Sequence, residues 1–259
     1  MRYSGSKARI AKHIIPFIMN ELHSGDVYIE PFVGGCNMID KINWENKYGY
    51  DLNKYVISMW SKIKEKQYNI FPKAVSEEDY NAMKKLALME KSTDDKYPEH
   101  LIGYVGNACS YGSAWFNGYA KYNEKRKENH ILEAWNGLSN QIKDFKNLST
   151  TSFVNQSYEE AFRYALSLKR SKGVNSVIYC DPPYKGTKGY MAKDFNHDRF
   201  WNLVRRFSKL GFKIFVSEYN APDDFECVWS MGRKDGMSIT KVGQKQSVKT
   251  EKLFIWQEF

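Results

Sequence analysis

The most constraining feature of this chain is a short apolar run that leads directly into a rigid polar turn. The run spans Val177 to Cys180, and the turn is Asp181-Pro182-Pro183-Tyr184. A short continuous apolar run bounded by a turn signal predicts a strand buried on both faces, as in a parallel sheet. Helices cover both faces of such sheets, so this junction favours an α/β fold.

The turn itself carries groups that suit a flat ligand with an NH2 group. Its two prolines, Pro182 and Pro183, fix the backbone and lack N–H donors, so the turn offers carbonyl oxygens. Asp181 adds a carboxylate acceptor and Tyr184 an aromatic ring. Ligands of open α/β sheets bind at the carboxyl ends of strands, where this turn is expected. The alternative is a plain strand-ending turn with a solvated Asp181.

A second pattern near the N-terminus predicts a nucleotide site. Residues 27–30 predict a strand, 31–35 a tight turn with two glycines, and 48–50 a strand that ends in Asp51. A strand, a glycine turn and a carboxylate about 20 residues later are typical of one half of a Rossmann-like unit. The glycine series that binds a pyrophosphate is absent from the sequence. The pattern favours a ligand with adenosine but no phosphate, whereas the glycines alone also fit an ordinary turn.

The middle of the chain, residues 55–150, has a different character. Ser76 to Asp79 is a helix-start signature, and helical spacing follows it. Residues 103–119 are rich in Gly, Asn and aromatic side chains, a basic stretch follows at 121–127, and neither helical nor strand periodicity holds there. This stretch predicts a loop that contacts bases and phosphates, or a glycine-rich packing loop.

Strand patterns return in the last part of the chain, near 152–154, 177–180, 213–217 and 253–256. We therefore expect an α/β fold, with a Rossmann-like sheet interrupted by a mainly helical insertion. In domain terms, we expect 1–54 and 151–259 to form the sheet domain and 55–150 the insertion.

Charge and cysteine usage narrow the function. The net charge is +9, and residues 163–209 alone carry 11 basic and 3 acidic side chains. A basic field around a site favours a polyanionic substrate over a solvated face. The four cysteines and five histidines are scattered, so we expect no metal site and no disulfide framework. No apolar stretch is long enough for a bilayer and no secretory signal is present, so we expect no membrane association and a cytoplasmic location.

Together these motifs resemble the Dam-type (D12 class) DNA adenine-N6 methyltransferases. Tyr3 to Lys7 is similar to the family's N-terminal aromatic-x-G-x-K motif, and Tyr28 to Gly35 to its F-x-G-G motif. Asp51 is similar to the ribose-binding acid, Phe153 to Tyr158 to the next cofactor segment, and Asp181 to Tyr184 to the D-P-P-Y motif. The resemblance covers most of the chain, in the family's order.

The resemblance implies S-adenosylmethionine as cofactor, double-stranded DNA as substrate, and a target-recognition role for the insertion. It implies cofactor contacts from Tyr3, Lys7, Glu30, Phe32, Gly34, Asp51, Ser157, Tyr158 and Asp181. We expect DNA contacts from Trp115, Asn117, Lys121, Lys125, Arg126, Lys185 and Lys188.

A mechanism follows from the exocyclic amine of adenine, which is a poor nucleophile because its lone pair is delocalised into the ring. The Asp181 carboxylate and the Pro182 carbonyl can accept both N–H groups, which favours a pyramidal nitrogen. Transfer is then an in-line displacement at a sulfonium, in which positioning dominates. The base must leave the duplex to reach the pocket, where Tyr184 can stack on it.

The sequence departs from the family pattern within the insertion. The Phe-Asn-x-Pro-Phe-Gly hairpin associated with members that read GATC is absent, and residues 115–119 take a comparable place. The alternatives are a methyltransferase of RNA or of a protein amide, and a non-catalytic nucleic-acid-binding relative. Asp181, the motif order and the basic C-terminal half favour DNA, and Asp51 and Lys7 favour catalysis. The sequence does not decide the recognition sequence or a restriction endonuclease partner.

Overall fold

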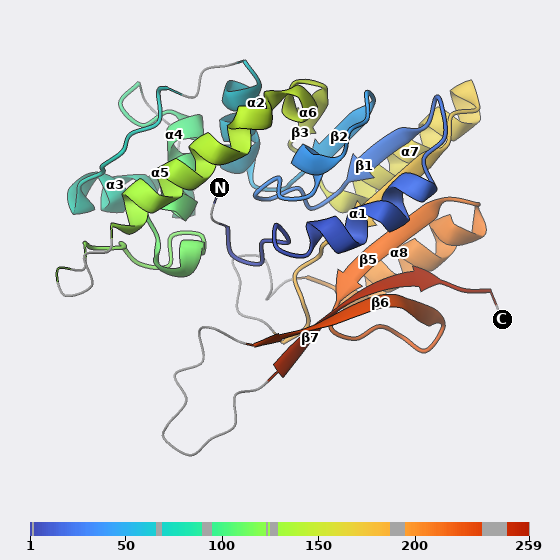
Figure 1. Cartoon of the computed structure of the whole chain (residues 1–259). Coiled ribbons are helices and arrows are strands. Elements are labelled where there is room, and N and C mark those ends of the chain that lie inside the picture. The colour runs from blue at the N-terminus through green and yellow to red at the C-terminus, as the bar shows by residue number, and fades with distance from the viewer. Residues whose placement is uncertain are drawn as a thin grey trace.

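The fold is built on one seven-stranded sheet, seen in the computed structural model of Figure 1. The structure describes residues 1, 3–65, 69–89, 95–122, 124, 129–186, 195–234 and 248–258. The strand order is β3-β2-β1-β4-β5-β7-β6. The strands are β1 (Val27–Glu30), β2 (Lys47–Tyr50), β3 (Thr151–Val154), β4 (Ser176–Cys180), β5 (Lys213–Glu218), β6 (Phe225–Lys234) and β7 (Val248–Trp256).

The first five strands are parallel and the last two are not. β3, β2, β1, β4 and β5 pair in parallel, whereas β7 pairs antiparallel with both β5 and β6. The order 3-2-1-4-5 is that of a doubly wound sheet, which confirms the predicted α/β Rossmann-like fold. β6 was not predicted, because its residues alternate only weakly between buried and exposed positions.

The two faces of the sheet bury two separate hydrophobic cores. Ile29 and Ile178 point to one face, where they pack with α7 (Tyr158–Lys172) and α8 (His197–Lys209). Tyr28 and Tyr179, one position away on the same strands, point to the other face and α1 (Ala11–Asn20). Successive side chains of a strand alternate between faces, so a continuous apolar run fills both cores.

All described residues between β2 and β3 that belong to regular elements are helical. The helices are α2 (Lys54–Lys64), α3 (Glu77–Leu88), α4 (Glu99–Ala108), α5 (His130–Gln141) and α6 (Phe145–Ser149), with 3-10 turns η1 (Ile39–Lys41), η2 (Tyr111–Ser113) and η3 (Ile142–Asp144) nearby. Ser76 caps α3 by accepting a hydrogen bond from the Asp79 N–H at 3.0 Å, as its signature predicted. The division into domains at residues 54 and 151 stays a prediction.

The predicted loop at 103–119 is partly wrong, because Gly103 to Ala108 form the second half of α4. Every residue from Ile102 to Ala108 is buried, so this part of the helix has no solvent-exposed face. A helix that is buried all round shows no amphipathic period, which hid it from the sequence pattern. A Cβ at Gly103 would lie 2.0 Å from the Tyr55 carbonyl oxygen, so glycine permits α4 to cross closely over α2.

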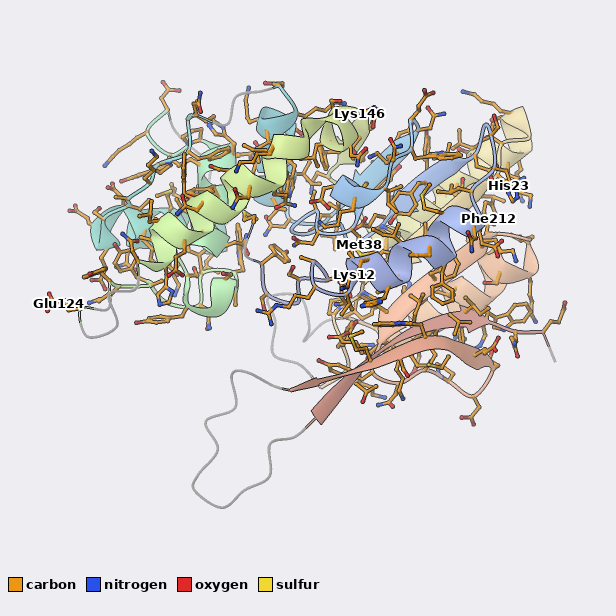
Figure 2. The ribbon with its side chains drawn as sticks, viewed as in Figure 1. Lys12, His23, Met38, Glu124, Lys146 and Phe212 are labelled. Atoms are coloured by element: carbon orange, nitrogen blue, oxygen red, sulfur yellow. The ribbon has the colours of Figure 1, made fainter. Side chains whose placement is uncertain are left out.

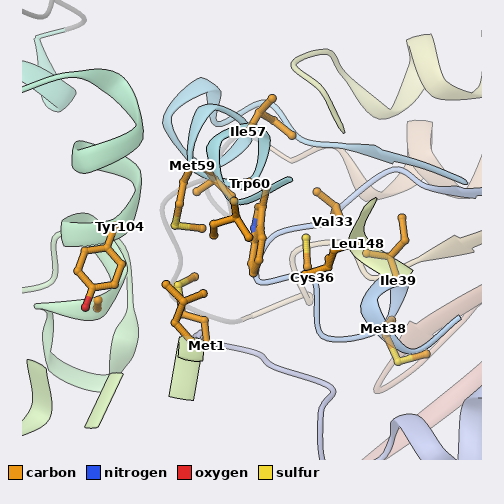
Figure 3. Packing of buried hydrophobic residues seen from close by; sticks show 14 of the residues in the cluster. Met1, Val33, Cys36, Met38, Ile39, Ile57, Met59, Trp60, Tyr104 and Leu148 are labelled. Atoms are coloured by element: carbon orange, nitrogen blue, oxygen red, sulfur yellow. The ribbon is translucent and has the colours of Figure 1, made fainter. Parts of the chain in front are cut away.

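Packing of the helical region fixes the turn after β1. Figure 3 shows Trp60 of α2 beside Val33 and Cys36, with Tyr104 of α4 beyond Met59. Trp60 also donates from Nε1 to the Gly34 carbonyl at 2.8 Å. At the opposite end of the strands, just before β5, Phe212 (Figure 2) packs on Phe207 of α8 and closes the second core. The helical region therefore holds the turn after β1 in place, at the carboxyl end of that strand.

Candidate active site

A cavity of about 620 Å³ opens at the carboxyl ends of β1, β2 and β4. Its size lies within the range of small-molecule sites, roughly 300–1,000 Å³. The chain leaves β1 toward β2 and β4 toward β5, so the cavity lies at the point where the strand order reverses. The N-terminal segment, the turns after these strands, α4, α8 and β7 all contribute to its lining.

The glycine turn after β1 and the acid after β2 meet inside this cavity. The Gly34 N–H donates to Asp51 Oδ2 at 3.0 Å, and the Asn53 N–H donates to Asp51 Oδ1 at 2.9 Å. Burial raises the pKa of Asp51, whereas these two hydrogen bonds lower it. Gly34 has a φ of 41°, and a Cβ there would lie 2.8 Å from the Tyr3 ring. Glycine therefore lets Tyr3 cover the turn.

Aromatic rings form one wall of the cavity. Phe32 stacks on Tyr158 with 5.4 Å between ring centroids, and Phe195 meets Phe32 edge-on at 5.8 Å. All three residues line the cavity. Phe195 was not among the residues predicted to line the site, since its aromatic character was the only signal. Ser157 lies apart from the described lining, because its Oγ accepts the Glu160 N–H and caps α7.

Half-buried Asp181 forms an ion pair with buried Lys7 in the lining of the same cavity. Lys7 Nζ lies 2.8 Å from Asp181 Oδ1, and the Lys7 side chain is only 4% exposed. Lys7 also donates to the Gly5 carbonyl at 3.0 Å and lies 4.6 Å above the centroid of the Tyr184 ring. Burial raises the pKa of Asp181, and the ammonium group of Lys7 opposes that shift. Two groups 174 positions apart in sequence thus form one charged pair.

Three buried glutamates surround this pair. Glu251 of β7 accepts a hydrogen bond from the Tyr184 hydroxyl at 2.9 Å. Glu218 of β5 accepts the Lys185 N–H at 2.7 Å. Glu30 of β1 accepts from the Tyr28 hydroxyl at 3.2 Å, and burial raises its pKa well above the usual range. The sequence indicated Glu30 but not Glu251, which lies in the last strand outside every motif.

The residues predicted to contact DNA are found in several environments. Trp115 lines the cavity and stacks on Tyr55 at 5.9 Å, so it is part of the packed helical region. Asn117 and Lys185 are exposed, and exposed Lys121 forms an ion pair of 2.9 Å with Glu77. The remaining predicted contacts, Lys125, Arg126 and Lys188, lie outside the described residues.

Fewer of the basic side chains between residues 163 and 209 lie near the cavity than the sequence indicated. Arg170 and Lys172 lie in the last turn of α7, and Arg206 and Lys209 in that of α8. The end of α7 lies near the beginnings of the strands, because Asn175, three residues after α7, accepts a hydrogen bond from the N–H of Val27, the first residue of β1. Helices that follow parallel strands run back antiparallel to them, so their C-terminal turns lie opposite the cavity. Arg199, at the beginning of α8, does line the cavity.

The comparison with known families decides the identity. Residues 3–222 match the sequence model of the D12 class N6 adenine-specific DNA methyltransferases. This chain belongs to that family. The D12-class chain is 22% identical over 245 residues to the DNA N-6-adenine-methyltransferase of Escherichia phage P1, covering 86% of this chain and 30% of that protein. It therefore spans less than a third of the length of that relative.

Solved structures are more distant from this D12-class chain. Two structures of the rRNA methyltransferase aviRa from Streptomyces viridochromogenes are 9% and 10% identical, and cover 96% of this chain and 84% of theirs. Both have a TM-score of 0.40, at which the likeness supports no conclusion. In the described part of the D12-class chain, no three His, Cys, Asp or Glu side chains are arranged to hold a metal ion. No described helix is long and apolar enough to cross a membrane.

Proposed function

We propose that this protein transfers a methyl group from S-adenosylmethionine to the N6 atom of an adenine flipped out of duplex DNA. The observation that carries the proposal is one cavity that holds both the Asp181-to-Tyr184 turn and the Gly34–Asp51 turn. Membership in the D12 class supports the reaction, and the phage P1 relative is named for it. The proposal concerns this chain alone and does not extend to the part of the phage P1 relative that lies outside the match.

The cavity fits an adenosine that bears no phosphate. Each Asp51 oxygen accepts one backbone N–H and keeps lone-pair capacity for a ribose hydroxyl. Phe32 and Tyr158 present apolar ring surface on which an adenine ring can pack. Tyr3 and Glu30 line the rest of this side of the cavity. When bound, S-adenosylmethionine supplies an electrophilic methyl group on a sulfonium.

The other side of the cavity fits a planar amine. The prolines after β4 cannot continue the ladder, so they end the strand and leave the Asp181 carboxylate at its tip. The carboxylate and the Pro182 carbonyl accept the two N–H groups of the amine and orient its lone pair. Lys7 opposes the rise that burial causes in the pKa of Asp181, and both groups are held before the substrate arrives, which lowers the cost of orientation.

We assign target recognition to the insertion of residues 55–150 and the catalytic role to 1–54 and 151–259. Trp115 and Asn107 reach the cavity from the helical region, so the insertion borders the place where a flipped base would lie. Exposed Lys185, directly after the catalytic turn, is placed to contact a phosphate. A DNA substrate also favours a cytoplasmic location.

The test is methyl transfer from tritiated S-adenosylmethionine to unmethylated duplex DNA, RNA and protein in parallel. We expect label in DNA alone, and N6-methyladenine in its nucleoside digest. Asp181→Ala should abolish transfer while calorimetry shows much of the cofactor affinity retained, because the carboxylate serves the target amine and the other predicted cofactor contacts remain. Asp223→Ala, which removes an exposed carboxylate, is the matched control. Label in RNA or protein, or near-normal transfer by Asp181→Ala, would contradict the proposal.

A further inference from the structure

The hydroxyl group of Tyr184 lies between two carboxylates, those of buried Glu251 and half-buried Asp181. It donates to Glu251 Oε2 at 2.9 Å, and both side chains are buried, with Tyr184 8% and Glu251 5% exposed. The same hydroxyl reaches the Asp181 carboxylate, whose pKa it lowers. A phenol carries one proton, so it donates to only one carboxylate at a time. The position of this proton therefore decides whether Tyr184 occupies one acceptor site of Asp181 or leaves it to a substrate.

We propose that Glu251 is a positioning residue for methyl transfer, because it accepts the hydrogen bond of the Tyr184 hydroxyl and leaves the Asp181 lone pairs to the target amine. This inference rests on the proposed function. Asp181 already accepts the Lys7 ammonium group at 2.8 Å, so a second strong donor would compete with the amine for the acceptor sites that remain. Glu251 lies beyond residue 222, where the family match ends, and only its place on β7 reveals it.

Glu251 also fixes the Tyr184 ring. One face of the ring lies under Lys7 Nζ at 4.6 Å, and Tyr219 meets it edge-on at 4.7 Å. The hydrogen bond to Glu251 anchors the third side. The sequence indicated a stacking role for the Tyr184 ring, and the hydrogen bond adds a role for its hydroxyl, which links the ring to β7.

The inference is tested by a double-mutant cycle of Glu251→Gln and Tyr184→Phe. A glutamine has nearly the same shape but can donate to the phenol oxygen, which turns the hydroxyl proton toward Asp181. We expect Glu251→Gln to lower kcat by about 10- to 100-fold, the scale of one charged hydrogen bond. The KM values for DNA and for S-adenosylmethionine should change far less. Glu226→Gln, the same change at an exposed position on β6, is the control.

The cycle separates positioning from a general structural role. In the Tyr184→Phe background no hydroxyl proton remains, so adding Glu251→Gln should change kcat little further. Equal effects of Glu251→Gln in both backgrounds would overturn the inference. Glu251→Asp keeps a carboxylate and should recover part of the lost rate. If Glu251→Gln lowers the melting temperature sharply while Glu251→Asp folds with no rate advantage over it, the role is structural and the inference is wrong.

A spectroscopic measurement tests the hydrogen bond between Tyr184 and Glu251 without relying on methyl transfer. Protein labelled at tyrosine Cζ with carbon-13 gives a Tyr184 signal, assigned by its loss in Tyr184→Phe. Glu251→Gln should move that signal, because the hydrogen-bond partner of the hydroxyl changes, and Glu226→Gln should not. An unmoved signal overturns the inference whatever the methyl acceptor is. A moved signal in a protein that methylates no DNA overturns the proposed function alone.

Discussion

Removal of the Lys7 charge should move the acid limb of the rate profile to higher pH. Lys7→Met keeps the length and apolar stem of the side chain but removes the ammonium group beside Asp181. Asp181 must be ionised to accept the target amine, so the rate falls as pH falls through its pKa. Burial already raises that pKa and Lys7 opposes the rise. Without Lys7 the carboxylate takes up a proton at a higher pH.

The size of the effect follows from the geometry of the pair. At 2.8 Å and an effective dielectric constant of about 20, two unit charges attract by roughly 6 kcal/mol. Desolvation offsets much of this attraction, and loss of one partner of a fully buried pair costs about 3–5 kcal/mol, an upper bound here because Asp181 is 21% exposed. Asp181 can relieve that cost by binding a proton, and each pH unit by which the limb moves corresponds to about 1.36 kcal/mol. The effect is therefore large enough to measure.

The assay is kcat against pH from about 5 to 9, at saturating DNA and cofactor. Lys12→Met is the control, because Lys12 is an exposed lysine of α1 (Figure 2) and its removal makes the same change in net charge. We expect a shifted acid limb in Lys7→Met and an unchanged limb in Lys12→Met. An identical limb in wild type and Lys7→Met would refute the reasoning, since Lys7 would then have no influence on the ionisation that governs the rate.

Three further predictions concern the cofactor, the helical region and DNA. Asp51→Ala should weaken S-adenosylmethionine binding by about 10- to 100-fold in calorimetry, because the ribose hydroxyls lose a charged acceptor; unchanged affinity would move the ribose site elsewhere. Gly103→Ala should destabilise the fold by about 1–3 kcal/mol in chemical denaturation, because its Cβ would lie 2.0 Å from the Tyr55 carbonyl oxygen. A fold of unchanged stability would disprove the close crossing of α2 and α4. Affinity for duplex DNA should fall with salt at a slope of about −0.9 per phosphate contact, and a flat response would contradict a DNA substrate.

Most of the sheet was predictable from sequence because its signals are local. The buried strands β1 and β4 each contain a short apolar run, and the helix start at Ser76 is a four-residue pattern. α4 was not predictable in the same way. Its glycines and the lack of a solvent-exposed face in its second half make sense only when the neighbouring helix and Trp115 are in place.

Some residues of the candidate site have a local sequence signal, and others do not. The sequence indicated the residues whose chemistry depends on a local backbone, such as Asp181 before two prolines and Asp51 at the end of a strand. Phe195 and Glu251 carry no such signal. Each acquires its place from an element that packs against the site, the start of α8 for Phe195 and β7 for Glu251.

The sequence by itself determined that this chain makes an α/β fold with a methyltransferase motif set, because prolines, glycines and short apolar runs constrain the backbone at each motif. The tertiary structure decided which side chains share a proton or a charge. Lys7 meets Asp181, and Tyr184 meets Glu251, only because the strand order reverses between β1 and β4 and an antiparallel strand then returns beside β5. Such pairs depend on crossover direction and strand register, which are properties of the whole sheet and not of any segment.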